Sequence, residues 1–240
     1  MAGNEISIAD YLFRNIGKVE LKHLGVVKEI SAPSSGGEYT VVVDLETLEL
    51  ISTEDAGKKA DIYINGSGVS LKQIGGSFAF NRLQRANLLE VFKSLNFLDF
   101  DNKLVLIDKE VKDFHEGRIE DGRNRPWSNF FSEDDFRILL KRLMLEFNPN
   151  KGLSKNPAKY ILEAPSINID VSNISVYTFD EYFDKYKTKF KVAIRRSWIG
   201  QDSKTEHGRA KSPRACFNDK NHFVFLECMI NFIIAMHVKF

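Results

Sequence analysis

The chain has 240 residues, of which 43% are apolar, 28% are charged and only two are cysteines. This length and composition are ordinary for a globular protein that folds without a disulfide or metal staple, and they exclude a disordered chain, a collagen-like repeat and a disulfide scaffold. The net charge of +1 hides an asymmetry, because residues 185–214 hold ten basic and two acidic residues. This basic segment carries +8 against −7 elsewhere, which favours a polyanionic partner.

Helix and strand patterns alternate along the first hundred residues. Residues 6–16 predict a short amphipathic helix and residues 19–30 a strand. Residues 38–45 predict another strand, which residues 48–52 extend or pair with. Alternating apolar residues on both sides of a glycine-rich turn predict a β-hairpin over residues 60–73. A helix is expected over residues 82–95, because its apolar residues recur at helical spacing.

The second half continues the same mixture. Residues 103–107 predict a short strand, and Ser132 is a helix N-cap with three acidic residues behind it. Strands are expected at residues 159–163, 175–178 and 191–196, and a helix from Phe179 whose aromatic stripe belongs to a core. The sequence therefore predicts an α/β fold with a central mixed β-sheet flanked by α-helices.

Neither end of the chain indicates a membrane or secreted protein. The N-terminus has no basic segment followed by an apolar run. The apolar residues 223–240 contain Glu227, Asn231 and His237, so they predict a buried helix or strand pair rather than a membrane span. The two cysteines, Cys216 and Cys228, form no CxxC pair and suit a reducing compartment. We expect a cytoplasmic protein with no membrane partner.

The hairpin brings charged residues together. A loop over residues 65–68 would pair Ile64 with Val69 and Asp61 with Lys72, and opposed residues share a face of the sheet. The face away from the core would then carry Asp61, Tyr63, Ser70 and Lys72. A carboxylate can hold Mg²⁺, which lowers the pKa of a bound water, while a neighbouring lysine orients that water or stabilises charge on a phosphate. The pattern thus indicates a metal-dependent phosphodiesterase.

The predicted order of helix, strand, Asp-bearing strand, Lys-bearing strand and helix resembles the PD-(D/E)XK nuclease core. The motif of that core stands here as Ala60-Asp61 and Ser70-Leu71-Lys72. The resemblance implies Asp61 as a metal ligand, the backbone carbonyl of Leu71 as a second ligand, and Lys72 as the residue that positions or activates water. Ser70 stands where the family has an acid and is a weak metal ligand. A second carboxylate would come from elsewhere, with Glu38 and Asp44 on the preceding strand as the nearest candidates and Glu20 behind them. Ser70 and Gln73 would support the site, with Gln73 in contact with the phosphate.

Two further stretches suit DNA. Behind the hairpin, a Gly-Gly-Ser loop leads to Arg82 and Arg85, a combination suited to binding a phosphate backbone. The basic segment mixes arginine, glutamine, lysine and histidine, which contact phosphates and read base edges. The candidate DNA contacts there are Arg195, Arg196, Gln201, Lys204, His207 and Arg209.

Residues 60–85, 156–165 and 195–201 are similar to the MboII group of type IIS restriction endonucleases. The resemblance implies a sequence-specific, Mg²⁺-dependent endonuclease that cuts double-stranded DNA. It also implies a cognate DNA methyltransferase in the same system, not physically bound, and allows a dimer on DNA. Residues 1–165 would form the nuclease core and residues 166–240 a basic DNA-contacting part with an apolar tail, unless both form one continuous domain. The composition changes near Ser212, so one hypothesis is that the tail comes from a shifted reading frame and leaves an inactive protein.

Other interpretations stay open. An exposed Asp–Lys cross-strand pair contributes only a few tenths of a kcal/mol and can be purely structural. The chain would then be a non-catalytic DNA- or RNA-binding module that uses residues 185–214. In a third interpretation, the basic segment binds an acidic protein.

Overall fold

The computed structural model describes residues 5–34, 36–52, 58–74, 77–115, 118, 124–148, 152–194 and 231–237. They divide into two compact units. The first comprises the described parts of Met1–Ser77 and Leu140–Thr188, and the second those of Phe78–Leu139 and Lys189–His237. The domain boundary predicted at residue 165 falls inside the first unit. No helix in these ranges is both long and apolar enough to cross a membrane.

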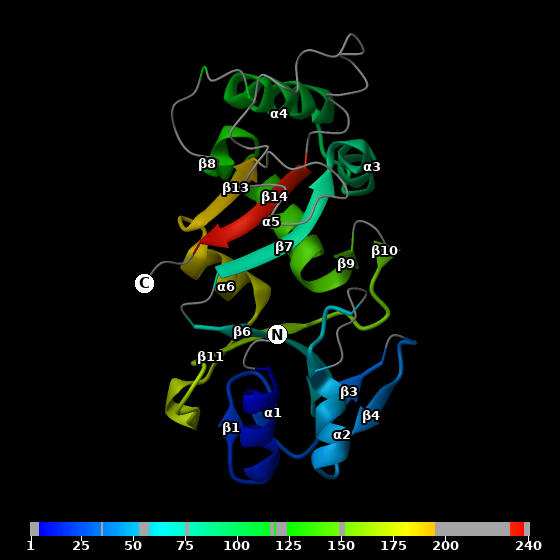
Figure 1. The fold of residues 1–240 in the computed structure, drawn as a ribbon, viewed down its shortest axis with the longest axis vertical. Coiled ribbons are helices and arrows are strands. Elements are labelled where there is room, and N and C mark those ends of the chain that lie inside the picture. The colour runs from blue at the N-terminus through cyan, green and yellow to red at the C-terminus, as the bar shows by residue number, and fades with distance from the viewer. Residues whose placement is uncertain are drawn as a thin grey trace, which may run out of the picture. The chain divides into compact units, whose positions relative to one another are not determined.

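The first unit is built on a six-stranded sheet with the order β12-β11-β6-β5-β3-β4. Figure 1 labels four of these strands, β3, β4, β6 and β11. Its strands are β3 (Ile30–Pro33), β4 (Tyr39–Val41), β5 (Ile62–Ile64), β6 (Ser67–Gln73), β11 (Tyr160–Ala164) and β12 (Ser175–Tyr177). Strands β6 and β11 run parallel, and the other neighbours are antiparallel. The mixed sheet flanked by helices is therefore confirmed, whereas the PD-(D/E)XK core stays a prediction.

Alternation along the strands gives the sheet an apolar face and a polar one. Ile62, Val69, Leu71 and Leu162 are buried in one core, together with residues of helix α1 (Glu5–Arg14) and helix α2 (Leu45–Glu49). Helix α1 forms as predicted, because Ile8 and Leu12 lie one turn apart on its buried stripe. Helix α6 (Phe179–Tyr186) belongs to the other face, since Tyr186 contacts Glu163, the neighbour of Leu162.

The hairpin of β5 and β6 forms, but its register differs from the prediction. Asn65 and Gly66 both have positive φ, 49° and 75°, as a two-residue type I′ turn requires. Ile62 therefore faces Val69, two residues away from the partner that a four-residue loop would give it. Because the shift is even, every side chain keeps its face.

The second unit contains a four-stranded sheet with the order β7-β14-β13-β8. Its strands are β7 (Ser77–Gln84), β8 (Asn124–Pro126), β13 (Phe190–Ile194) and β14 (Asn231–His237). Its helices are α3 (Arg85–Ser94), α4 (Phe100–His115) and α5 (Glu133–Lys141), and α5 ends two residues after this segment of the unit, which ends at Leu139. Ser132 caps α5 through the Asp135 amide at 3.2 Å, as predicted. The predicted apolar tail contributes β14, and its other residues lie outside the described ranges.

Three predicted strands are wrong. Residues 19–30 form two short strands, β1 (Glu20–Leu21) and β2 (Gly25–Val26), separated by a turn in which His23 has φ 67°. Residues 48–52 are helical, because Asp44 and Thr47 form a capping box that starts α2. Residues 103–107 lie inside α4, where Leu104 and Ile107 are buried one turn apart. The remaining elements are short: β9 (Phe147–Asn148), β10 (Gly152–Leu153), the 3-10 helices η1 (Leu50–Ser52), η2 (Trp127–Asn129) and η4 (Val171–Asn173), and the π-helix η3 (Arg142–Glu146).

Candidate active site

Asp61 lies where the hairpin departs from regular pairing. Its amide donates to the carbonyl of Val69 at 2.9 Å, although Ile62 is already the ladder partner of Val69. Two consecutive residues thus face one, which is the arrangement of a β-bulge, a feature common next to active sites. The bulge lets the Asp61 carboxylate, rather than a backbone carbonyl, accept the amide of Leu71 at 2.6 Å.

Ser70 and Lys72 complete a cluster on the polar face. Ser70 Oγ donates to Asp61 Oδ2 at 3.2 Å and accepts from Lys72 Nζ at 2.6 Å. The lysine also donates to the Leu71 carbonyl at 2.9 Å and stands 3.9 Å from Asp61 Oδ2. The structure therefore brings together four groups chosen from sequence, in side chains that are mostly shielded from water: 23% of Asp61 and 16% of Lys72 are exposed.

Lys59 is a second cation that sequence reasoning missed. Its Nζ donates to the carbonyl of Leu143 at 2.6 Å, in the π-helix that follows α5. Burial, and next the like charge of Lys72, lower the pKa of Lys59 to about 8, while Asp61 opposes the shift. The charged side chains that shift the Lys59 pKa are thus one lysine and one carboxylate. The signal in the sequence is its position two residues before Asp61.

Asn156 fixes this end of the hairpin. The residue is buried, and its backbone carbonyl accepts the amides of Lys59 and Ala60 at 3.0 and 2.9 Å. Its side chain donates to the Ser34 carbonyl at 2.5 Å and accepts from the Tyr63 hydroxyl at 3.1 Å. A buried asparagine with each of these bonds made holds several segments in one arrangement.

Glu163 is a buried carboxylate on the same face. It is the ladder partner of Lys72 across the parallel strands β6 and β11, and only 3% of it is exposed. Its Oε2 accepts from the Tyr186 hydroxyl at 2.7 Å and from Lys185 Nζ at 3.3 Å. Its charge is therefore partnered by helix α6, and Lys185 of the basic segment is partly used inside the fold.

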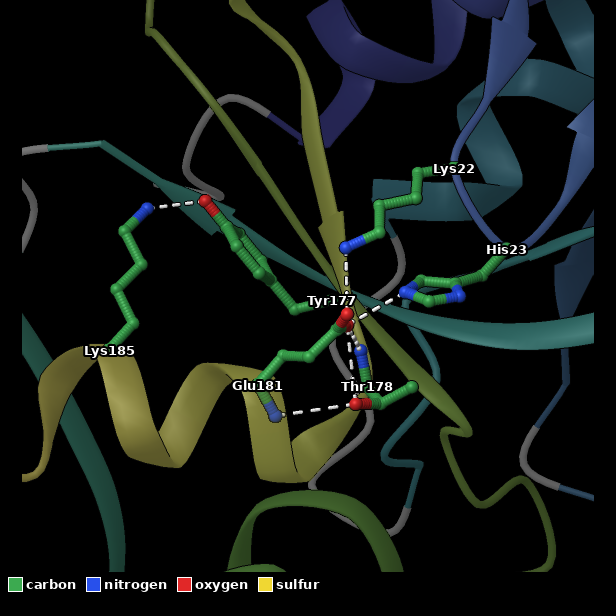
Figure 2. A network of polar contacts seen from close by, with 6 residues as sticks. All are labelled: Lys22, His23, Tyr177, Thr178, Glu181 and Lys185. Atoms are coloured by element: carbon green, nitrogen blue, oxygen red, sulfur yellow. Dashed lines mark hydrogen bonds and ion pairs between the residues drawn. The ribbon is translucent and has the colours of Figure 1, made fainter.

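A separate polar network lies at the start of α6 (Figure 2). Glu181 accepts from Lys22 Nζ at 2.7 Å, and its other oxygen lies 2.7 Å from His23 Nε2. The Thr178 amide also donates to Glu181 at 2.8 Å, within a capping box. These contacts, led by Lys22, lower the pKa of Glu181 to about 2. The network joins the β1–β2 turn to α6.

Other predicted site residues are placed elsewhere. Glu38 is exposed beside β4, which lies three strand spacings, about 14 Å, from the strand β6 that carries Ser70 and Lys72, so it is not placed in the cluster. Asp44 caps α2 instead. Gln73 alternates with Lys72 and lies toward the opposite face. Arg82 lies in β7 rather than in a helix, and Arg85 begins α3. The remaining predicted DNA contacts fall outside the described residues: Arg195, Arg196, Gln201, Lys204, His207 and Arg209.

The donor set can be tested against Mg²⁺. Asp61 Oδ2 and the Leu71 carbonyl both lie near the Lys72 ammonium group, which shows that they converge on a position that favours a cation. Mg²⁺ takes oxygen ligands and is bound through one or two carboxylates, with water and substrate phosphate completing the set. The two oxygens fit that pattern once Lys72 turns away. In the described ranges, no cluster of three or more acidic, histidine or cysteine side chains could hold an ion alone.

Comparison with protein families, with curated proteins and with solved structures finds no match. What distinguishes the candidate site is that a carboxylate, a hydroxyl, a carbonyl and a lysine meet on one face of a mixed sheet.

Proposed function

We propose that the chain is a Mg²⁺-dependent endonuclease of the type II restriction class, acting on double-stranded DNA. The observation that carries the proposal is the Lys72 ammonium group, held by Ser70 and the Leu71 carbonyl beside the Asp61 carboxylate. The +8 charge of residues 185–214 supports a polyanionic substrate. A cognate methyltransferase would belong to the same system.

Each residue has a role in this proposal. Asp61 and the Leu71 carbonyl would hold Mg²⁺, which lowers the pKa of a bound water and neutralises charge on the phosphate. Lys72 turns toward a phosphate oxygen or the attacking water when its present partners are taken up, and its flexible stem permits this movement. Ser70 bonds to both charged groups and keeps them in register. Asn156 holds the strand that carries Asp61.

Plasmid cleavage with Mg²⁺ tests the proposal. Wild type should give discrete fragments, and Asp61→Asn or Lys72→Met should lower the rate at least about 100-fold, as loss of a group that stabilises transition-state charge does. Asp101→Asn and Lys28→Met, both at exposed positions, are matched controls that should cut like wild type. Equal cleavage by Asp61→Asn and wild type would refute the assigned site.

A second function is favoured by one observation. Asp61 Oδ2 already accepts two hydrogen bonds and lies beside Lys72, so the cluster is also a satisfied structural pair. In that case the chain is a nucleic-acid-binding module without chemistry. Intact plasmid in every sample, together with a salt-dependent gel shift, would establish this alternative.

A further inference from the structure

Two tyrosines form a stack on the polar face of the first unit. The rings of Tyr39 in β4 and Tyr63 in β5 have centroids 5.0 Å apart and planes inclined by 23°. Tyr63 alternates with Ile62 and Ile64, which belong to the apolar core, so its ring lies on the face that carries the Asp61 cluster. Tyr39 is 53% exposed and so leaves part of its ring open to a ligand.

The stack is held rigid from beneath. The Tyr63 hydroxyl donates to Asn156 Oδ1 at 3.1 Å, and the Asn156 side chain is anchored in turn on the Ser34 carbonyl. The same asparagine binds the amides of Lys59 and Ala60 just before Asp61. One buried residue therefore fixes both the aromatic stack and the segment that enters the candidate active site. An aromatic surface held in this way loses little conformational entropy when a ligand stacks on it.

Three lysines lie on segments next to the strands that carry the stack. Lys155 is exposed and packs on the β3–β4 turn, where a Cβ added at Gly37 would lie 3.1 Å from Lys155 Cβ. Lys59 and Lys72 lie beside the Asp61 carboxylate, and Glu163, the ladder partner of Lys72, has its charge partnered by Lys185 and Tyr186. Lys155 and the exposed ring of Tyr39 belong to the same corner of the unit, because β4 begins at Tyr39 directly after the turn on which Lys155 packs. Cationic grooves with interposed aromatic rings are how proteins hold single-stranded nucleic acid.

We infer that the Tyr39–Tyr63 stack binds an unpaired nucleobase of the strand whose phosphate lies at the Asp61–Ser70–Lys72 cluster. This inference rests on the proposed function and specifies that the double-stranded substrate is locally unpaired at the site. A base inside a duplex has both ring faces covered, so only an unstacked base can lie on Tyr39. Strands β4 and β6 are three spacings apart, about 14 Å, so the base and the phosphate belong to different nucleotides.

Binding of a fluorescently labelled single-stranded oligothymidylate, measured by anisotropy without Mg²⁺, tests this inference. Tyr39→Ala should weaken binding about 5- to 150-fold, the range for one base–aromatic stack, whereas Tyr39→Phe should bind like wild type. With an abasic oligonucleotide of the same length, Tyr39→Ala and wild type should bind equally. Lys155→Met should weaken binding to both oligonucleotides, because it removes a phosphate contact.

Circular dichroism of each variant verifies the fold. Equal binding of oligothymidylate by Tyr39→Ala and wild type would overturn the inference, and so would an equal loss with the abasic oligonucleotide. Its failure is distinguishable from that of the proposed function. A protein that cuts plasmid but shows no Tyr39 effect lacks the stacking site, whereas one with the Tyr39 effect and no cleavage has the stacking site without the nuclease.

Discussion

Ser70 is the residue at which this chain departs from the nuclease pattern, and the structure gives it a definite task. Its hydroxyl donates to Asp61 and accepts from Lys72, so it separates two opposite charges that stand 3.9 Å apart. An acid there would place a second negative charge beside Asp61 in a poorly solvated position. The serine keeps Lys72 near the carboxylate without that repulsion.

A change at Tyr63 measures how much the hydrogen bonds of Asn156 contribute to the free energy of unfolding. Tyr63→Phe removes one donor and leaves the buried Asn156 Oδ1 without that partner, which should lower the free energy of unfolding by about 1–3 kcal/mol. Urea unfolding gives the value. Tyr39→Phe is the matched control, because the same change is made on an exposed ring, and it should stay within about 0.5 kcal/mol of wild type. Equal stability of both variants would contradict a stabilising role for the hydrogen bond between Tyr63 and Asn156.

The meeting of Asp61, Ser70 and Lys72 could be predicted from sequence because it depends only on alternation within one hairpin. Even a register wrong by two residues left them on one face. Asn156 and Glu163 could not be found in this way. Each reaches the site from β11 or the loop before it, and a parallel pairing between distant strands leaves no local signal.

At the scale of elements, strand β6 packs closely on the loop before β11. A Cβ added at Gly68 would lie 2.4 Å from the Pro157 carbonyl and 3.1 Å from Ala60 Cβ, so the backbones must separate. Gly68→Ala should therefore destabilise the protein by about 1–3 kcal/mol, the range for overpacking. Thermal unfolding measures the change. Gly36→Ala, whose added Cβ would meet only Ser34 Oγ at 3.6 Å, should leave the transition near that of wild type. A silent Gly68→Ala would show that this contact relaxes freely.

Helix α6 is tied to the β1–β2 turn by the Glu181 charge. The pKa of Glu181 in the folded protein is about 2, against an ordinary value of 4.5. The stability that the ionised Glu181 contributes is therefore complete above pH 4.5 and is lost as the pH falls toward 2. Glu181→Gln retains an N3 side chain that can form the capping box but removes the charge. We expect wild type to have a higher melting temperature than Glu181→Gln at pH 7, and we expect this difference in melting temperature to be smaller at pH 3. A difference independent of pH would assign the effect to hydrogen bonding alone.

Amphipathic helices were the elements that sequence periodicity predicted best. Helices α1 and α6 each bury a continuous stripe of apolar and aromatic side chains, and the N-cap residue Ser132 marks the start of α5. Short windows failed, because five residues such as 103–107 cannot separate a buried helix face from a strand. The two-residue turn at Asn65-Gly66 was missed because Ser67 and Gly68 also suit turns, although Asn-Gly is the stronger signal.

At the scale of the whole chain, the two units are discontinuous in sequence. The second is inserted between β6 and the segment that leads to β11, and it resumes after α6. No local change in composition marks the points at which the chain passes from one unit to the other, so the sequence predicts only a single boundary at residue 165. Strand β14 lies between β7 and β13, so residues 231–237 are integrated into a sheet.

The charge asymmetry of the chain predicts binding to DNA that depends on salt concentration. If residues 185–214 contact DNA phosphates, affinity should fall with salt, and each lost contact should reduce the slope of log K against log salt by about 0.9. We expect the combined change of Arg195, Arg196 and Arg209 to alanine to reduce that slope, measured by anisotropy with a duplex between 50 and 200 mM salt. Arg14→Ala is the control, because Arg14 pairs with Asp10 at 2.8 Å in the acidic remainder. An unchanged slope would assign the basic segment to a solvated face or an acidic protein, since a phosphate-binding segment cannot lose three cations without releasing fewer counterions.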